Sequence, residues 1–165
     1  MAVSAYEVIS TQTLGTAAAS VTFSSIPQIY TDLVLVCFAN YATGGAVGSI
    51  TLQFNNDTAS NYSWIYMQGT GTSSVSGFSH TANVAVGGSG GSSSGSYFGT
   101  GVAEIYNYSN TTTYKSTLTR ADADNGAQAW CSIWRNTNAI SSINIFGPYN
   151  FASNSTFTLY GIKAA

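Results

Sequence analysis

The feature that most constrains the fold is a regular alternation of side-chain character within residues 50–67. Leu52 and Phe54 alternate with polar neighbours, and a half-buried β-strand has this period. A second alternating run, residues 62–67, carries a line of aromatic side chains: Tyr62, Trp64 and Tyr66. Residues 55–57 (Asn-Asn-Asp) separate the runs, and these residue types favour turns. We therefore predict a hairpin with an exposed turn and an aromatic face that is either core or contact surface.

The same alternation recurs along the chain. Further strand-like runs are separated by Gly, Pro, Asn and Ser turn signals and lie at residues 6–12, 20–26, 31–39, 80–86, 102–108, 111–120, 127–135, 139–146 and 155–162. Residues 28–32 are the best place for a short helix. The pattern predicts an all-β, single antiparallel β-sandwich, jelly-roll-like, with about ten short strands. We expect one domain over residues 1–165, with residues 1–12 as an N-terminal arm or edge strand and the Gly/Ser-rich residues 87–101 as a flexible loop.

Charged side chains are scarce. Lys, Arg, Asp and Glu make up 6% of the chain, against about 25% in an ordinary soluble domain. The net charge of −2 and four basic residues leave no footprint for nucleic acid or for an anionic membrane surface. Low charge also gives little repulsion between copies, which favours residence in an assembly. The first dozen residues lack a basic segment, so we expect no signal peptide and synthesis in a cytoplasm.

Groups for catalysis or metal binding are few. His80 is the only histidine, which excludes a zinc site built from several imidazoles. Residues 87–91 match G-x-S-x-G, but no helix is predicted after them, as a nucleophile elbow requires. Residues 122–126 are one residue short of a calcium loop and lack its glutamate, so we predict a plain turn. Asp57 and Glu104 have no pattern that pairs them for glycoside hydrolysis. We expect no enzymatic activity, no cofactor and no metal.

Aromatic side chains are plentiful, with eleven Tyr, eight Phe and three Trp. We expect Trp64, Trp130 and Trp134 to fill the sandwich core. Cys37 and Cys131 lie in apolar runs and are expected to be small buried hydrophobes rather than a disulfide or a metal pair. Tyrosine combines a large apolar area with a polar group. The tyrosines near polar turns are therefore candidates for exposed contacts: Tyr41, Tyr97, Tyr108, Tyr114 and Tyr149.

Several segments resemble small structural proteins of tailed bacteriophages, which are frequent in aquatic and cyanobacterial phages. The resemblance spans most of the chain and is weakest between residues 70 and 125. The segments that carry it are Gln12-Thr-Leu, residues 18–27 (Ala-Ala-Ser-Val-Thr-Phe-Ser-Ser-Ile-Pro), residues 30–35 (Tyr-Thr-Asp-Leu-Val-Leu), residues 54–64 and residues 155–163. The resemblance implies a virion component and carries over no catalytic residue.

Two virion roles follow from this resemblance. The first is a capsid decoration (cement) protein, a homo-oligomer and most plausibly a trimer, which binds the major capsid protein at the outer capsid and bridges its subunits. The N-terminal arm is then a candidate contact with that protein. The alternative is a tail-fibre or receptor-binding module that recognises a cell-surface glycan through exposed Tyr and Trp. We expect a capsid location, because a single domain without a stem or collagen-like repeat suits a capsid-bound module.

Overall fold

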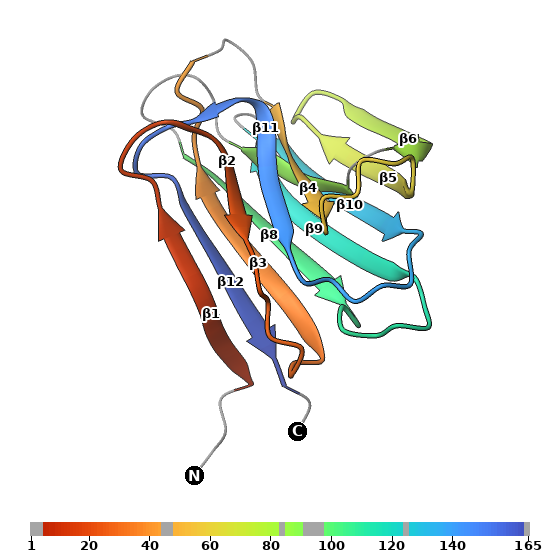
Figure 1. Ribbon diagram of the computed structural model, residues 1–165. Coiled ribbons are helices and arrows are strands. Elements are labelled where there is room, and N and C mark those ends of the chain that lie inside the picture. Colours follow the sequence, from red (N-terminus) through yellow and green to blue (C-terminus); the bar gives the residue numbers. More distant parts are fainter. Residues whose placement is uncertain (1–4, 44–47, 83–84, 91–97, 124–125, 164–165) are drawn as a thin grey trace.

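A computed structural model describes residues 5–43, 48–82, 85–90, 98–123 and 126–163. The regular secondary structure of these residues consists of β-strands only (Figure 1). The strands are β1 (Tyr6–Thr13), β2 (Ala18–Phe23), β3 (Asp32–Ala39), β4 (Gly48–Phe54), β5 (Tyr62–Gly69), β6 (Ser74–Ala82), β7 (Ala85–Gly90), β8 (Gly99–Tyr106), β9 (Lys115–Ala123), β10 (Gly126–Trp134), β11 (Ile143–Phe151) and β12 (Thr156–Ile162). The described residues include no helix that could cross a membrane.

The strands form two antiparallel sheets. The large sheet has the order β1-β12-β3-β8-β9-β10-β5-β6, and the small sheet has the order β2-β11-β4-β7. Four ladders are nested along the chain, because β1 pairs with β12, β2 with β11, β3 with β8 and β4 with β7. This is the pairing of a long hairpin rolled into two layers, the jelly roll. The predicted jelly-roll-like sandwich is confirmed, and we call these eight strands the jelly-roll frame.

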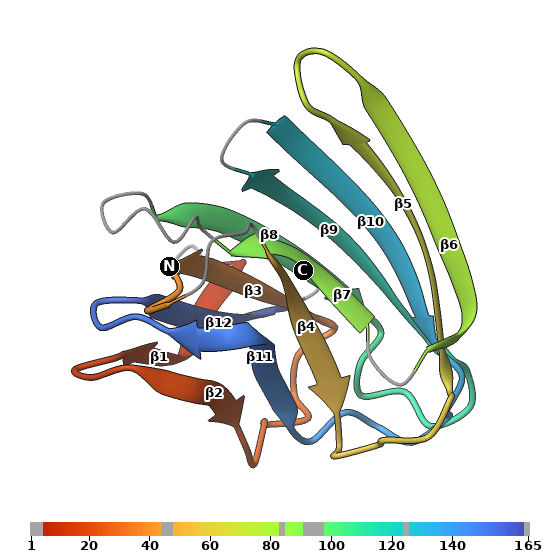
Figure 2. The same ribbon diagram turned by 90° about the horizontal axis from the view of Figure 1, so that it is seen from above.

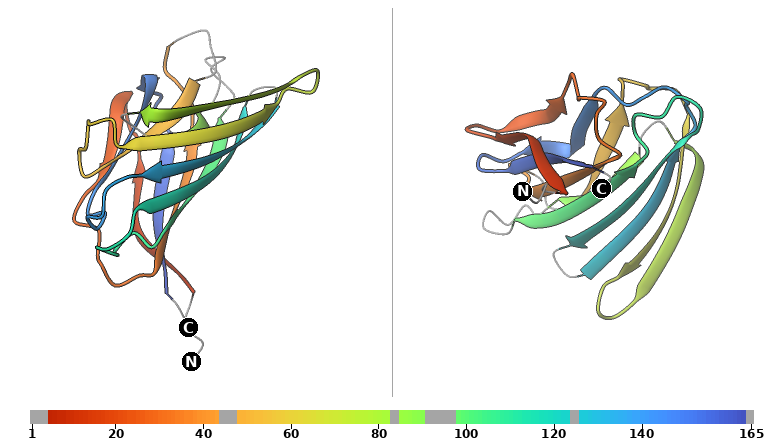
Figure 3. Two further views of the ribbon diagram at one scale, coloured as in Figure 1. Left: turned by 90° about the vertical axis from the view of Figure 1, so that its right-hand side faces the viewer. Right: turned by 90° about the horizontal axis from the view of Figure 1, so that it is seen from below.

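The other four strands are two inserted hairpins. One hairpin, β5–β6, lies between β4 and β7 in the chain, and the other, β9–β10, lies between β8 and β11. Strand β9 pairs with β8, and β10 pairs with both β9 and β5. The hairpins therefore extend the large sheet, and they project beyond the small one (Figures 2 and 3). We call β9, β10, β5 and β6 the wing.

The core lies between the two sheets of the frame. In the large sheet Leu35 pairs with Leu159 and Ala103, and all three side chains are buried. Leu52 pairs with Ile145 in the small sheet, and both are fully buried. Burial of a leucine or isoleucine side chain stabilises the fold by about 1.5–3 kcal/mol. The frame is thus a two-layer sandwich in which period-two alternation directs one face of each sheet inward.

The hairpin predicted at residues 50–67 is wrong, although both of its strands exist. Strand β4 belongs to the small sheet and β5 to the large one, so residues 55–61 cross between layers. Alternation defines which side chains share a face, but it does not identify the partner strand. The turn residues 55–57 therefore belong to a connection between the two sheets and not to a hairpin turn.

Three other local predictions are corrected. Residues 28–32 form no helix, and Asp32 already begins β3. The Gly/Ser-rich segment is not a flexible loop at residues 87–90 and 99–101, which belong to β7 and β8; residues 91–97 lie outside the described residues. The strand expected at residues 80–86 is in fact the end of β6 and the start of β7. Residues 1–12 were predicted to be an N-terminal arm or an edge strand; residues 6–12 lie in β1, which ends the large sheet, and residues 1–4 lie outside the described residues.

Candidate contact surface

The wing is attached to the frame through a fully buried aromatic group. Phe54, Tyr62 and Trp134, which we call the base cluster, are 0%, 0% and 1% exposed. The rings of Tyr62 and Trp134 are stacked with centroids 6.3 Å apart, and Phe54 lies 5.7 Å from Trp134. The Tyr62 hydroxyl accepts a hydrogen bond from the Phe54 backbone N–H at 3.0 Å. The base cluster therefore joins β5 and β10 of the wing to β4 of the small sheet.

The crossing segment that follows β4 is held by its own polar side chains. The Asn55 side chain donates to the Ala139 carbonyl at 2.8 Å and accepts from the Ser141 backbone N–H at 2.8 Å. Asp57 Oδ2 accepts a hydrogen bond from Trp134 Nε1 at 2.8 Å. Asn55 and Asp57 are half-buried, so the expected exposed turn is wrong for both, and only Asn56 between them is exposed. The turn residues connect the two layers.

Asp57 is ionised in this setting. Its partial burial alone would raise the pKa, but hydrogen bonds from Asn61, Trp134 and the Ala59 backbone N–H outweigh burial and hold the pKa of Asp57 below its ordinary value. A carboxylate that accepts several hydrogen bonds is favoured in its charged form. Asp57 thus has a structural role at the base of the wing.

On its inner face, the wing carries a second aromatic group. Trp64, Tyr66 and Trp130 form the inner wing cluster, in which Tyr66 stacks on Trp130 with centroids 4.2 Å apart and Trp64 meets Trp130 edge-on at 5.3 Å. Gly77 lies opposite Tyr66 on β6, where a Cβ atom would come within 2.6 Å of the tyrosine ring. Trp130 is buried, whereas Trp64 and Tyr66 are half-buried. This cluster packs β5, β6 and β10 together.

The three tryptophans therefore differ in environment. Trp134 lies in the sandwich core, as predicted. Trp130 is buried, as predicted, but by the inner wing cluster rather than by the main core. Trp64 is only half-buried, so its predicted core position is wrong. The three aromatics of β5 do share one face, as the alternation predicted, because each pairs across β10 in regular register.

The opposite, outer face of the wing exposes apolar side chains. Ile65, Met67 and Phe78 are 58%, 67% and 67% exposed, and Ile133 is 45% exposed. Cys131 is also exposed and pairs directly with Ile65, which pairs with Phe78 on its other side. We call these five residues the outer wing patch. Contiguous exposed apolar side chains are typical of protein contact surfaces rather than of free monomer surface.

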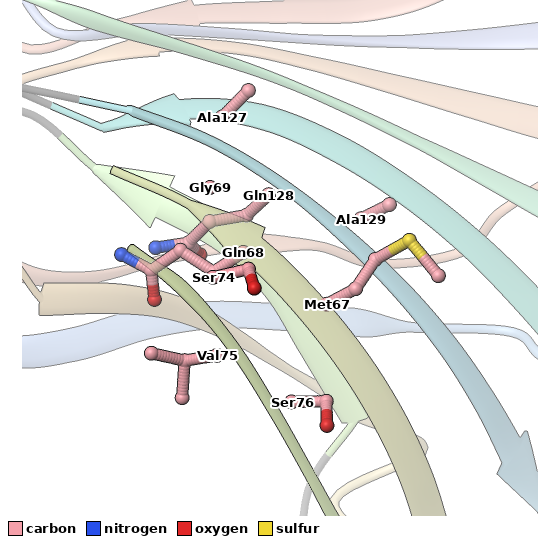
Figure 4. A pocket seen from close by; sticks show the side chains of 9 residues that line it. All are labelled: Met67, Gln68, Gly69, Ser74, Val75, Ser76, Ala127, Gln128 and Ala129. Carbon is pink, nitrogen blue, oxygen red and sulfur yellow. The ribbon is translucent and has the colours of Figure 1, made fainter. Parts of the chain in front are cut away.

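Two shallow depressions lie along this face. One, of about 470 Å³, is lined by members of the outer wing patch together with Ser63 and His80. The other, of about 540 Å³, lies toward the end of the wing (Figure 4). There the Met67 side chain lies beside Ala129, and the surrounding residues are mostly small. Small side chains beside large ones give the relief into which a partner's side chains can fit.

The β5 and β6 part of this face carries no charged residue. No Asp, Glu, Lys or Arg occurs between Asp57 and Glu104. The nearest ion pair joins Arg120 on β9 to Glu104 on β8 at 2.6 Å, at the border with the frame. The Tyr106 hydroxyl donates to the Glu104 carboxylate, and this hydrogen bond raises the pKa of Tyr106 to about 12. The outer wing patch is therefore apolar, with two arginines at its border: Arg135, which donates to Ser63 Oγ at 2.7 Å, and Arg120, which lies opposite Ala129 on the same face.

The candidate contact tyrosines are only partly supported. Tyr41 and Tyr108 are 2% and 0% exposed, so their predicted exposure is wrong. The Tyr108 hydroxyl donates to the Pro27 carbonyl, which satisfies its polar group inside the molecule. Tyr114 and Tyr149 are exposed, as predicted, but they lie outside the outer wing patch. Tyr97 lies outside the described residues.

Sequence reasoning missed the outer wing patch, although a signal for it was present. Residues 62–67 are apolar on both faces, since Ile65 and Met67 alternate with the aromatics. Cys131 and Ile133 repeat this pattern opposite Trp130 and Trp134. A strand that is apolar on both faces is covered on both faces, and in this chain the outer cover is absent from the described residues.

The cysteines and other potential ligands form no metal site in the described residues. Cys37 is buried, as predicted, whereas Cys131 is exposed, and neither forms a disulfide. No group of three or more His, Cys, Asp or Glu residues lies close enough to hold a metal ion within the described ranges.

The sequence matches no protein-family model and no curated protein.

Proposed function

We propose that the protein is a non-enzymatic structural component of a phage virion, a capsid decoration protein that binds the outer capsid and stabilises contacts between major capsid protein subunits. The observation that carries this proposal is the outer wing patch. Ile65, Met67 and Phe78 are each more than half exposed and adjoin one another on two strands, β5 and β6, that contain no charged residue. The resemblance to tailed-phage structural proteins supplies the setting.

The chemistry of the wing suits such a role. Burying apolar surface contributes about 25 cal/mol per Å², and a neutral face such as this one requires no matched charges on the partner. A protein that binds only the assembled capsid stabilises the assembled state by mass action, without any reaction. The frame supplies a rigid support, because its core residues, such as Leu33, Leu35 and Phe157, are fully buried.

The test is quantitative mass spectrometry of purified virions of the phage that encodes the chain. We expect a copy number comparable to that of the major capsid protein. Particles assembled without the protein should release their genome at a lower temperature, and adding it back should restore the release temperature. Equal heat resistance with and without the protein, or a copy number on the scale of the tail, would contradict capsid decoration.

The inner wing cluster favours a second candidate, recognition of a cell-surface glycan by a tail-fibre or receptor-binding module. Trp64 and Tyr66 are half-buried, and Trp130 Nε1 donates to the Gln128 side chain at 3.1 Å, which places an amide beside the rings. Aromatic faces bind the C–H groups of sugars, and amides bind their hydroxyls. Glycan-array binding that is lost in Trp64→Ala but retained in Met67→Ser would favour this role over capsid decoration.

A further inference from the structure

Strand β6 forms an unprotected edge of the large sheet, whereas the opposite edge strand, β1, is protected. Strand β6 ends the large sheet and pairs only with β5 among the described strands. An edge strand presents unpaired N–H and C=O groups, and proteins normally protect such edges with charges, proline, bulges or short length. The segment Ser74–Ser79 has none of these: it pairs regularly with β5 and contains no proline and no Asp, Glu, Lys or Arg.

The opposite edge, β1, is protected. Its ladder with β12 is interrupted between Val8 and Ser10, so its regular runs are short. Glu7 on β1 forms an ion pair with Lys163 at 2.8 Å. A bulge and an edge charge are the devices that prevent strand addition. The two edges of this sheet therefore differ: β6 has a register shift after Ser79, but its segment Ser74–Ser79 is regular and uncharged and is open to another strand.

We propose that β6 pairs antiparallel with β6 of a second copy of this chain, across a twofold axis at Gly77. The regular segment of β6 ends at Ser79, because the register shifts between Ser79 and Ala82. A twofold axis perpendicular to the sheet requires that one residue lies opposite the same residue of the second copy, with the axis midway between the two. An axis at Gly77 places Val75 opposite Ser79 of the second copy and uses the regular segment almost symmetrically.

The side chains and charges at this edge also favour a second copy. Val75 and Phe78 are 45% and 67% exposed on opposite faces of β6, and the pairing brings each of them against a strand of the second copy. Strands β5 and β6 contain no Asp, Glu, Lys or Arg, so two β6 edges approach without like-charge repulsion between these strands. Isologous twofold pairing is also the commonest symmetry of protein oligomers. The result is a dimer with a continuous large sheet, in place of the trimer that the resemblance implies.

The test combines solution mass with backbone exchange on the full-length protein. Sedimentation equilibrium should give a dimer, and amides in Ser74–Ser79 should exchange more slowly as the protein concentration rises, while β1 amides should not respond. Ser76→Lys, which adds a charge to the edge, should weaken the dimer by about tenfold or more. Met67→Lys is the matched control, because Met67 is on the same face but one strand away from the edge, and it should leave the dimer intact.

Three results would overturn this inference. They are a monomer at every accessible concentration, a trimer, and a dimer that Met67→Lys breaks and Ser76→Lys does not. The last would place the contact on the face of the wing instead of its edge. Far-ultraviolet circular dichroism and a thermal melt of each variant confirm that it is folded. Dimer formation is measured on the isolated protein, so this inference is independent of capsid decoration. Either proposal can fail without the other.

Discussion

The base cluster and the inner wing cluster have similar side chains but different surroundings. Both lie on β5 and β10, and both stack a tyrosine on a tryptophan, Tyr62 on Trp134 in the first and Tyr66 on Trp130 in the second. The base cluster lies under the small sheet and is fully buried. The inner wing cluster lies beyond the sandwich core, and its Trp64 is half-buried. Cover by a second layer, rather than local sequence, makes the difference.

The frame and the wing show the same contrast at a larger scale. In the frame, each sheet has one face against the core, and its stability comes from two-layer burial. The wing is covered less completely: β7 of the small sheet contacts β9 and β10 and touches β5 only slightly, and the outer wing patch remains exposed. We expect stability to depend on the buried core, including the base cluster through which the wing joins the frame, and we propose binding for the exposed outer face of the wing. Substitutions in the base cluster and in the outer wing patch should therefore separate these properties.

The largest effect is expected for Trp134→Ala. Trp134 is 1% exposed and contacts Phe54 and Tyr62, so the substitution should lower the free energy of unfolding by about 3–5 kcal/mol. Trp64→Ala is the matched control in the wing, and it should cost only about 1–2 kcal/mol because Trp64 is half-buried. Urea denaturation measures both. Equal losses would mean that the wing is as well covered as its base.

A smaller loss is expected for Asp57→Ala. The substitution leaves the buried Trp134 N–H without the acceptor that it has at 2.8 Å, which costs about 1–3 kcal/mol. The folded-state pKa of Asp57 lies below its unfolded value, so the stabilisation is present above the unfolded pKa and is lost as pH falls through the folded pKa. Denaturation between pH 2 and pH 7 should show a weaker acid dependence in the variant. If the acid dependence of the free energy of unfolding is unchanged in the variant, groups other than Asp57 are responsible for it.

Alkaline pH should destabilise the fold. Burial raises the pKa of Cys37 to about 12, and burial likewise raises the pKa values of Tyr41 and Tyr62 above 10.0. These acids keep their protons in the folded state after the unfolded state has lost them. Their stabilisation is therefore complete below the unfolded pKa values, near 9 and 10, and is lost as pH rises toward the folded ones.

Each of these three groups should cost about 1.4 kcal/mol per pH unit within that window. Denaturation midpoints measured from pH 8 to pH 11 provide the test. Cys37→Ala removes one titrating group and should reduce the slope. A stability that is constant to pH 11 would contradict the burial of these side chains in the core.

The smallest effect on stability is expected in the outer wing patch. Met67→Ser and Ile65→Ser replace side chains that are 67% and 58% exposed, so each should change the free energy of unfolding by less than about 1 kcal/mol. Their effect should appear in binding instead. A large loss of stability in either variant would mean that these side chains are part of the fold's own packing.

Period-two patterns were sufficient for the fold class and for which side chains share a face. The aromatic line of residues 62–66 and the pairing of Trp130 with Trp134 on one face are local consequences of the pleat. The partner of each strand is a non-local property, so the crossing at residues 55–61 was mistaken for a hairpin. The nested ladders, such as β1 with β12, join residues far apart in the chain, and no local signal identifies them.

The candidate site was harder to predict than the fold. Tyr41 and Tyr108 follow strands near polar turns, yet tertiary packing buries both rings. Conversely, Ile65 and Met67 have the composition of core residues, but they lie on the face of the large sheet that points away from the small sheet and are exposed. Exposure depends on which layers overlap, and alternation alone does not specify the overlap.

The central claim, that the outer wing patch binds the capsid, is tested most directly by occupancy on particles assembled without the protein. The variants are the double substitution Ile65→Ser/Met67→Ser and the control Val8→Ser, which removes an exposed apolar side chain from β1 of the frame. We predict that wild type and the control saturate the particles equally, while the double variant, still folded, needs about tenfold more protein or fails to bind. Equal occupancy of the double variant and wild type would contradict the claim.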